Sequence, residues 1–118
     1  MKREFRLTQS IDFKRVRQSG KSYAHPLVVL IVLANEKDKS RCAVSAGRSV
    51  GNAVERNRAK RLLRESVRQK FHQISPGWDV IIIARRGAAQ AHLSEIDHTI
   101  TNLLKRAGIL KEAHDTGS

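Results

Sequence analysis

Residues 78–84, WDVIIIA, form a short run rich in β-branched residues, and both of its sets of alternate positions are apolar. Side chains of a strand point alternately to the two faces of its sheet, so a strand that is half exposed alternates apolar and polar residues. This run therefore predicts a strand that is covered on both faces and lies in the centre of a sheet. Other elements of the chain have to cover that sheet.

Two earlier segments also predict strands. Residues 27–34, LVVLIVLA, are β-branched and apolar, and residues 41–47, RCAVSAG, alternate after the polar turn NEKDKS. Because a short polar turn joins the two segments, we expect neighbouring antiparallel strands.

Three segments carry helix signals. Each has a capping residue whose side chain can accept a backbone hydrogen bond. The first helix is capped by Ser10 and stopped by Gly20, the second runs from about Ala53 to about Phe71 after Asn52, and the third is capped by Ser94 and ended by Gly108. Asn52 and Glu55 resemble a capping box, and Phe13 and Val16 give the first helix a short apolar stripe. The tail after about residue 110 is polar, and we expect it to be frayed.

The predicted order is helix, two or three strands, helix, strand, helix. This order predicts helices packed against one small sheet, within a single domain that covers residues 1–118. The long helix lies between two strands and makes a βαβ unit. Nearly all connections between parallel strands of one sheet are right-handed, so we expect a right-handed crossover for this unit.

The basic residues are concentrated in two segments. Lys and Arg outnumber Asp and Glu by 23 to 11, which gives a formal net charge of +12. Residues 1–21 hold seven basic and two acidic side chains, residues 41–70 hold nine and two, and the rest of the chain balances. A solvated surface would spread its charge evenly, so this concentration favours a polyanionic partner, and nucleic acid in particular.

The long predicted helix places its arginines on one face. Asn57, Arg61, Arg64 and Arg68 fall in a narrow sector, opposite a packing side made of Ala59, Leu62, Leu63, Ser66 and Val67. Arg58 lies on one flank of this sector, and Arg56 and Lys60 lie on the other. Arginine forms bidentate contacts with phosphate and stacks on exposed bases, so the face favours structured RNA over simple charge neutralisation.

Other classes of protein are disfavoured. The single Cys42 excludes an intramolecular disulfide, and no Cys/His cluster has zinc-site spacing. The longest apolar run, residues 27–34, is less than half of the roughly 20 residues that span a bilayer, and no signal peptide opens the chain. We therefore expect a cytoplasmic protein with no membrane contact.

The chain offers no convincing catalytic group of its own. A metal-dependent nuclease needs convergent carboxylates, but Glu95 and Asp97 face different ways on a helix, and Glu36 and Asp38 lie among lysines in a turn. The histidines are scattered without partners. We expect a non-catalytic chain with no metal site.

The segment GNAVERNRAKRLLRE, residues 51–65, closely resembles the signature of the bacterial ribonuclease P protein family. The RNR motif of that family stands here at Arg56, Asn57 and Arg58. The resemblance extends in order over nearly the whole chain, through the first helix, the turn at Gly20, the strand of Arg41, and WDVIIIAR ending in Arg85.

This resemblance implies an α+β two-layer sandwich, with three helices and a small four-stranded mixed sheet. It also implies a left-handed βαβ crossover, shared with a domain of a small-subunit ribosomal protein, and this replaces the right-handed expectation. Two surfaces for RNA are implied. The first, on the RNR helix and its adjoining loop, would meet the catalytic RNA through Arg48, Asn52, Arg56, Asn57, Arg58, Lys60, Arg61, Arg64 and Arg68.

The second implied surface is a cleft between the first helix and the sheet that receives the 5′ leader of precursor tRNA. Its residues here would be Phe13, Val16, Arg17, Arg41 and Arg85. Two positions depart from the family pattern: Arg17 stands where an aromatic residue is common, and Gly47 stands where a basic residue is common.

The implied function is that of the protein subunit of ribonuclease P, which assists endonucleolytic removal of the leader. The RNA subunit would perform catalysis and hold most of the Mg²⁺ of the holoenzyme, and the protein alone would bind no cofactor. Three alternatives stay open: a ribosomal or ribosome-assembly protein of the same fold, a DNA-binding architectural protein and, least favoured, a protein nuclease.

Overall fold

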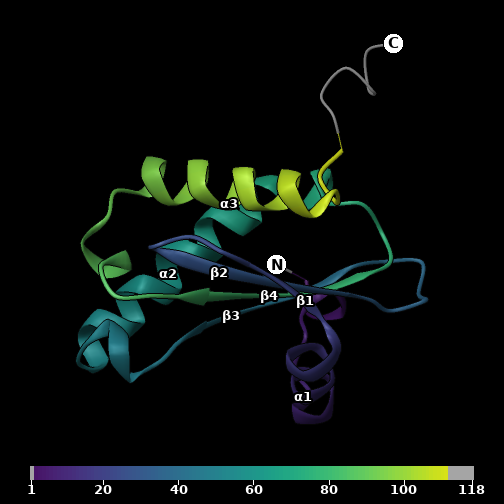
Figure 1. Cartoon of the computed structure of the whole chain (residues 1–118), viewed down its shortest axis with the longest axis horizontal. Helices are drawn as coiled ribbons and strands as arrows, with labels where there is room; N and C mark the ends of the chain where they lie inside the picture. The colour runs from purple at the N-terminus through teal and green to yellow at the C-terminus, as the bar shows by residue number, and fades with distance from the viewer. Residues whose placement is uncertain (1, 112–118) are drawn as a thin grey trace.

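The computed structural model describes residues 2–111 and contains a four-stranded sheet in the order β1-β2-β4-β3 (Figure 1). The strands are β1 (Lys21–Ala24), β2 (Val28–Ala34), β3 (Arg41–Ala46) and β4 (Trp78–Ala84). Strand β4 pairs antiparallel with β2 on one edge and parallel with β3 on the other. The central position predicted for residues 78–84 is confirmed.

The prediction that the second and third strands are neighbours is wrong. Strands β2 and β3 run antiparallel, as expected, but β4 lies between them. The physical reason lies in β4, whose residues are almost all buried, so that its backbone needs a hydrogen-bonding partner on each edge.

Three helices pack against this sheet: α1 (Ser10–Ser19), α2 (Ala53–Lys70) and α3 (Leu93–Ala107). Helices α2 and α3 cover one face, and α1 lies against the other (Figure 1). The α+β class with three helices and a mixed sheet is therefore confirmed, with α1 as a partial layer on the second face. The parallel pair β3 and β4 is joined through α2, and the hand of this crossover stays a prediction.

The two sheet faces bury separate apolar clusters. Val80 and Ile82 of β4 join the larger cluster with α2 and α3, whereas Ile81 joins Leu7, Val16 and Ile31 under α1. The alternation of β4 therefore supplies both clusters, which explains why its sequence is apolar on both faces.

The helix ends match the sequence signals in part. Asn52 accepts the Glu55 N–H at 2.9 Å and donates its own N–H to the Glu55 carboxylate at 3.2 Å, which confirms the capping box. Gly108 ends α3 with φ 75°, in the left-handed region that glycine favours.

The predicted caps at Ser10 and Ser94 are wrong. Helix α1 begins at Ser10 and is preceded by Gln9 as its cap residue, and α3 begins at Leu93 after His92. In both cases the carbonyl of that earlier residue already accepts the first helical N–H groups, so the serine lies inside the first turn. The predicted fraying after residue 110 falls mostly on residues 112–118, outside the described residues.

Candidate RNA-binding surface

The arginines of α2 lie on the solvent side of the helix. Ala59, Leu63 and Val67 are buried against the sheet and α3, which turns Asn57, Arg58, Arg61, Arg64 and Arg68 outward. We call Arg61, Arg64 and Arg68 the arginine stripe. The sequence prediction of one packing side and one charged side is confirmed for this helix.

Acidic side chains neutralise only one member of the stripe. Arg68 donates to the Glu65 carboxylate through Nε at 3.1 Å and Nη2 at 2.6 Å. The hydrogen bond from Arg68 lowers the pKa of Glu65, which keeps the carboxyl ionised. Within the described residues, Arg61 and Arg64 make no ion pair, so their charges are available to a ligand.

The remaining residues predicted to meet the catalytic RNA extend the charge toward the start of α2. Arg48 is exposed in the short 3-10 turn before the helix, and Arg56 and Lys60 are half-buried on one flank of the stripe. Asn52 is exposed, but its side-chain oxygen accepts the capping hydrogen bond. Asn52 therefore positions the first turn of the helix.

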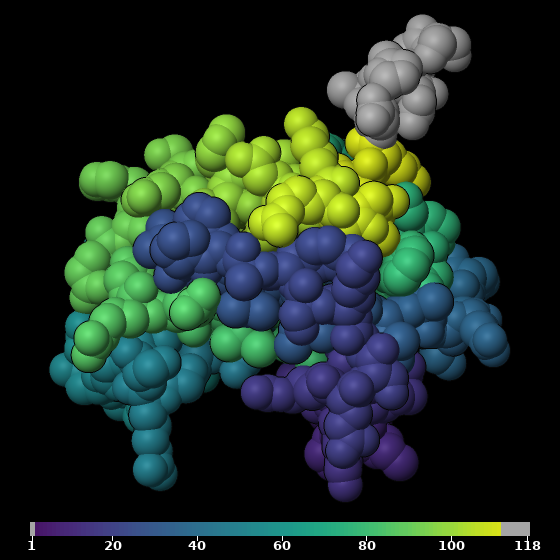
Figure 2. Space-filling model, in the orientation of Figure 1, coloured from purple at the N-terminus to yellow at the C-terminus, as the bar shows by residue number. Residues whose placement is uncertain are grey.

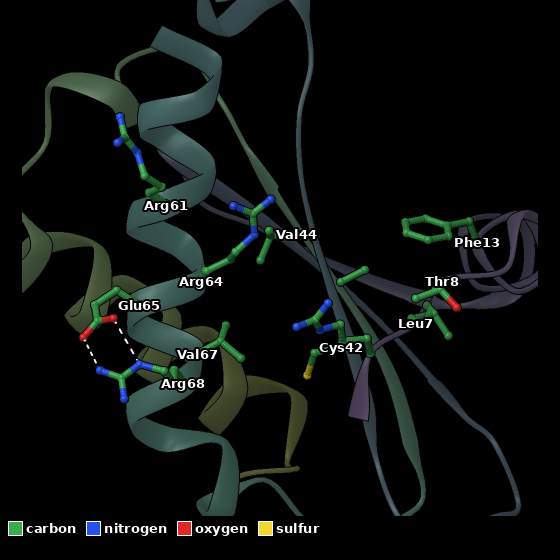
Figure 3. A pocket seen from close by; sticks show the side chains of 12 residues that line it. Leu7, Thr8, Phe13, Cys42, Val44, Arg61, Arg64, Glu65, Val67 and Arg68 are labelled. Atoms are coloured by element: carbon green, nitrogen blue, oxygen red, sulfur yellow. Dashed lines mark hydrogen bonds and ion pairs between the residues drawn. The ribbon is translucent and has the colours of Figure 1, made fainter. Parts of the chain in front are cut away.

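A groove of about 800 Å³ separates the arginine stripe from the first helix. One wall carries the stripe, the floor is formed by Cys42, Ala43 and Val44 of β3, and the other wall carries Leu7, Thr8 and Phe13 (Figure 3). In the space-filling view, α1 and the segment leading into α2 project from the same side of the molecule with a hollow between them (Figure 2). Of the predicted RNA-binding residues, Arg61, Arg64 and Arg68 of the first surface and Phe13 of the second line this groove.

The five residues predicted for the leader cleft have different environments. Phe13 is half-buried beside the groove, and Arg17 and Arg85 are exposed. Val16 is completely buried in the cluster under α1, so it supports Phe13 from below and has no surface for a ligand. Arg85 donates a hydrogen bond of 3.3 Å to the carbonyl of His25, at the opposite end of β4 from Arg41.

Arg41 is held by a buried carboxylate that the sequence analysis missed. Its Nε and Nη2 donate to Asp79 at 2.9 and 2.8 Å, and its Nη1 lies 3.4 Å from Asp12. All three guanidinium nitrogens therefore face carboxylates, and the side chain is only 17% exposed. A role for Arg41 in gripping leader phosphates directly fits this geometry poorly.

Asp79 is the centre of an ionic cluster that ties α1 to the sheet. Its side chain is fully buried in β4 and accepts hydrogen bonds from Arg41 of β3, Arg15 of α1 and Asn35, the last at 2.9 Å. Burial on its own raises the pKa of Asp79, but the hydrogen bonds from Arg41, Asn35 and Arg15 outweigh it and lower that pKa below its usual value. A charged residue inside an apolar strand needs such partners, and this was the signal available in the sequence.

A second ion pair, between a buried lysine and a partly exposed aspartate, joins α2 to α3. Lys70 is buried and donates to Asp97, and the Ser66 hydroxyl donates to the same carboxylate at 2.9 Å. Asp97, considered above as a catalytic candidate, is thus occupied by a structural contact.

The described residues contain neither a cluster of metal ligands nor an ionised thiol. Across residues 2–111, no three His, Cys, Asp or Glu side chains gather in a way that could hold a metal ion. Burial raises the pKa of Cys42 to about 12, so its thiol stays protonated and unreactive near neutral pH. In the same range, no helix combines the length and the apolar character that a membrane crossing requires.

Comparison with known proteins gives a consistent match over almost the full length. The family model described as Ribonuclease P matches residues 1–108. The ribonuclease P protein component of Herpetosiphon aurantiacus is 44% identical over 107 residues, covering 91% of this chain and 87% of the relative. The corresponding protein of Clostridium novyi is 41% identical over 111 residues, covering 92% and 98%.

Solved structures agree with the fold. The RNase P protein of Staphylococcus aureus superposes with a TM-score of 0.80 at 31% identity, covering 91% of this chain and 98% of that one. The RNase P protein of Thermotoga maritima superposes with a TM-score of 0.76 at 30% identity, covering 86% and 96%. The resemblance first noted in residues 51–65 is thus matched by sequence similarity over residues 1–108 and by the fold of the backbone.

Proposed function

Since this chain belongs to the ribonuclease P protein family and is a subunit of that tRNA-processing enzyme, we propose that it binds two RNAs through the surface described above. The exposed face of α2 and the turn before it bind the catalytic RNA. The side of the sheet that carries α1 binds the 5′ leader of precursor tRNA. Both partners are cytoplasmic in a bacterium, and we place the protein there.

The observation that carries this proposal is the exposed and mostly unpaired arginine on α2. Like charges three or four residues apart on a helix repel by about 0.2–0.5 kcal/mol per pair, and within the described residues Glu65 is the one acid in ion contact with the stripe. A phosphate backbone removes this repulsion and accepts bidentate hydrogen bonds from the guanidinium groups.

The catalytic step belongs to the RNA in this proposal. The protein supplies fixed positive charge near phosphates that would otherwise need Mg²⁺ to approach one another, and the RNA holds most of the Mg²⁺ of the holoenzyme. The protein therefore lowers the Mg²⁺ requirement of the reaction and itself cleaves no bond.

Reconstitution tests the proposal. Precursor tRNA is incubated with the RNA subunit alone, with the protein alone and with both, over a Mg²⁺ titration. We expect cleavage by the RNA alone at high Mg²⁺, cleavage by the complex at lower Mg²⁺, and none by the protein. Metal-dependent cleavage by protein that has been freed of all RNA would contradict the assignment of catalysis to the RNA.

A further inference from the structure

We propose that a shallow hollow between α2 and α3 binds one unstacked base of the catalytic RNA, with Leu62 and Leu93 as its apolar walls. This inference rests on the proposed function and deepens it, because it names the part of the catalytic RNA that this flank of α2 recognises. Two arginines beside the hollow bind the phosphates that flank the base.

The hollow lies on the flank of α2 that is next to the start of α3. The residues that line it are Arg58, Arg61, Leu62 and Glu65 of α2 and Leu93, the first residue of α3. Its volume is about 350 Å³, at the small end of the range of about 300–1,000 Å³ for ligand pockets. A space of this size suits a single base and is too small for a base-paired helix.

This flank of α2 carries apolar side chains in one row with an arginine. Val54, Arg58 and Leu62 are four residues apart, so they follow one another along the helix. Val54 is 72% exposed, and Leu62 packs on the core with only part of its side chain. A phosphate gains nothing from an apolar neighbour, whereas the face of an unstacked base does. The row therefore fits a base better than a sugar-phosphate backbone alone.

Leu93 supplies the second apolar wall and has no role in the core. It is half-buried, but it belongs to neither apolar cluster of the described residues. Because α3 begins at Leu93 and the Lys70–Asp97 pair joins α3 to α2, the packing of the two helices sets the position of this wall. A leucine that is not needed by the core keeps its apolar surface available to a ligand.

The charges around the hollow match RNA. Within residues 2–111, Arg58 and Arg61 form no ion pair. Glu65 lies at the rim, but Arg68 and the Gln69 amide donate hydrogen bonds to its carboxylate, which occupies its oxygens. Guanidinium groups bind phosphates and stack on bases, and loops and bulges of RNA present both groups together. The hollow is also continuous with the surface proposed for the catalytic RNA, because Arg58 and Arg61 belong to both.

The experiment compares Leu93→Gln with Leu93→Met in the full-length protein. The two new side chains have similar length and helix propensity but differ in polarity. We expect the glutamine variant to bind the catalytic RNA about five to ten times more weakly than the methionine variant, a difference of about 1–1.4 kcal/mol. Ile11→Gln is the control, because Ile11 is a 74% exposed apolar residue on α1, and its effect should be less than about twofold. Melting temperatures check that all three variants are folded.

A second measurement identifies the base. Catalytic RNA that lacks single bases at random positions is mixed with each Leu93 variant, and the missing bases are mapped in the bound and free RNA. With Leu93→Met we expect one or two positions at which loss of the base weakens binding. With Leu93→Gln the effect at the same positions should be smaller, because a base and the wall that it contacts act as a pair.

Three results would overturn the inference. Equal binding of the catalytic RNA by the two Leu93 variants would mean that the hollow takes no base and that the arginines contact phosphates alone. Identical maps of missing bases would place the recognised base elsewhere on the protein. Intact assembly with weaker binding of both precursor and mature tRNA would assign the hollow to the tRNA. Failure of the unaltered protein to assemble with the RNA subunit would instead contradict the proposed function itself.

Discussion

At the scale of single residues, Asp79 determines where α1 lies. Its fully buried carboxylate binds Arg15 from the helix and Arg41 from the neighbouring strand, and Asp12 closes the cluster from the helix side. Phe13 lies between Asp12 and Arg15 in the sequence, so the cluster fixes the aromatic wall of the groove. Arg41 therefore helps to position α1, and its contact with the leader stays a prediction.

Asp79→Asn should destabilise the fold and loosen α1. Removing one partner of a buried pair costs about 3 kcal/mol, because the remaining charge loses its counter-ion. Denaturant unfolding measures this loss, and the double variant Asp79→Asn with Arg41→Gln should recover part of it. If the single variant is as stable as the unaltered protein, the cluster contributes nothing to the position of α1.

The same carboxylate makes stability depend on acid pH. Hydrogen bonds lower the pKa of Asp79 in the fold, so its contribution to stability is complete above the ordinary aspartate pKa of about 3.9. That contribution falls as the pH drops through the lower pKa of the folded state. Unfolding free energies measured from pH 6 downward should therefore decline in acid for the unaltered protein, and less steeply for Asp79→Asn.

Phe13→Leu separates a base contact from a core contact. Leucine keeps most of the apolar packing but has no ring for stacking, so we expect weaker binding of precursor tRNA, little change for mature tRNA and a modest shift in melting temperature. Phe5→Leu is a matched control, since the Phe5 ring packs on Phe71 with centroids 5.0 Å apart. A Phe13 variant that loses several kcal/mol of stability but keeps its precursor preference would place the ring in the core.

At the scale of elements, the junction of α1 and β1 depends on close backbone packing at Gly20. A Cβ at this position would lie 2.5 Å from the Val16 carbonyl oxygen and 2.8 Å from the Ile31 side chain. The helix therefore meets the sheet at a distance that only glycine permits.

Gly20→Ala should accordingly displace α1 and cost about 1–3 kcal/mol, as overpacking does elsewhere. Gly47→Ala is its control, because a Cβ there meets no atom within 4 Å. Thermal unfolding of the two variants checks this, with the control expected within about 0.5 kcal/mol of the unaltered protein. Equal melting temperatures for both variants would mean that the junction can relax.

The elements themselves were predictable because local patterns encode them. The strand of residues 78–84, the capping box at Asn52 and Glu55, and the charged and buried sides of α2 all follow from spacing within a few residues. The pairing of the strands does not follow from such local spacing. The insertion of β4 between β2 and β3 depends on contacts between residues more than thirty positions apart. The same limit explains why the contact between Arg41 and Asp79 was not predicted, since the two residues are 38 positions apart.

At the scale of the whole molecule, the net charge of +12 is unevenly distributed in space. Arg61 and Arg64, which make no ion pair among the described residues, line one groove, while α3 mixes acids and bases. The position of a charge, and not only the total, should therefore decide how binding responds to salt.

Two double variants with the same loss of charge test this. Arg58→Ala with Arg61→Ala removes two charges from α2, and Lys105→Ala with Lys111→Ala removes two exposed charges near the end of α3. Each lost phosphate contact lowers the slope of log affinity against log salt by about 1, so the α2 variant should have the shallower slope for the catalytic RNA. Equal slopes for both variants would show that only net charge matters.

The place of β4 between β2 and β3 also has a consequence for how the chain folds during synthesis. The ribosome releases β2, a short turn and β3 well before β4, and β3 pairs with no other strand of the finished sheet. Until residue 84 has emerged, β2 can already pair with β1, but a β2–β3 hairpin is the pairing open to β3, and it is the pairing that local sequence favours. We expect β4 to displace this hairpin, so completion of the sheet, and of the groove at its edge, waits for the last strand to be made.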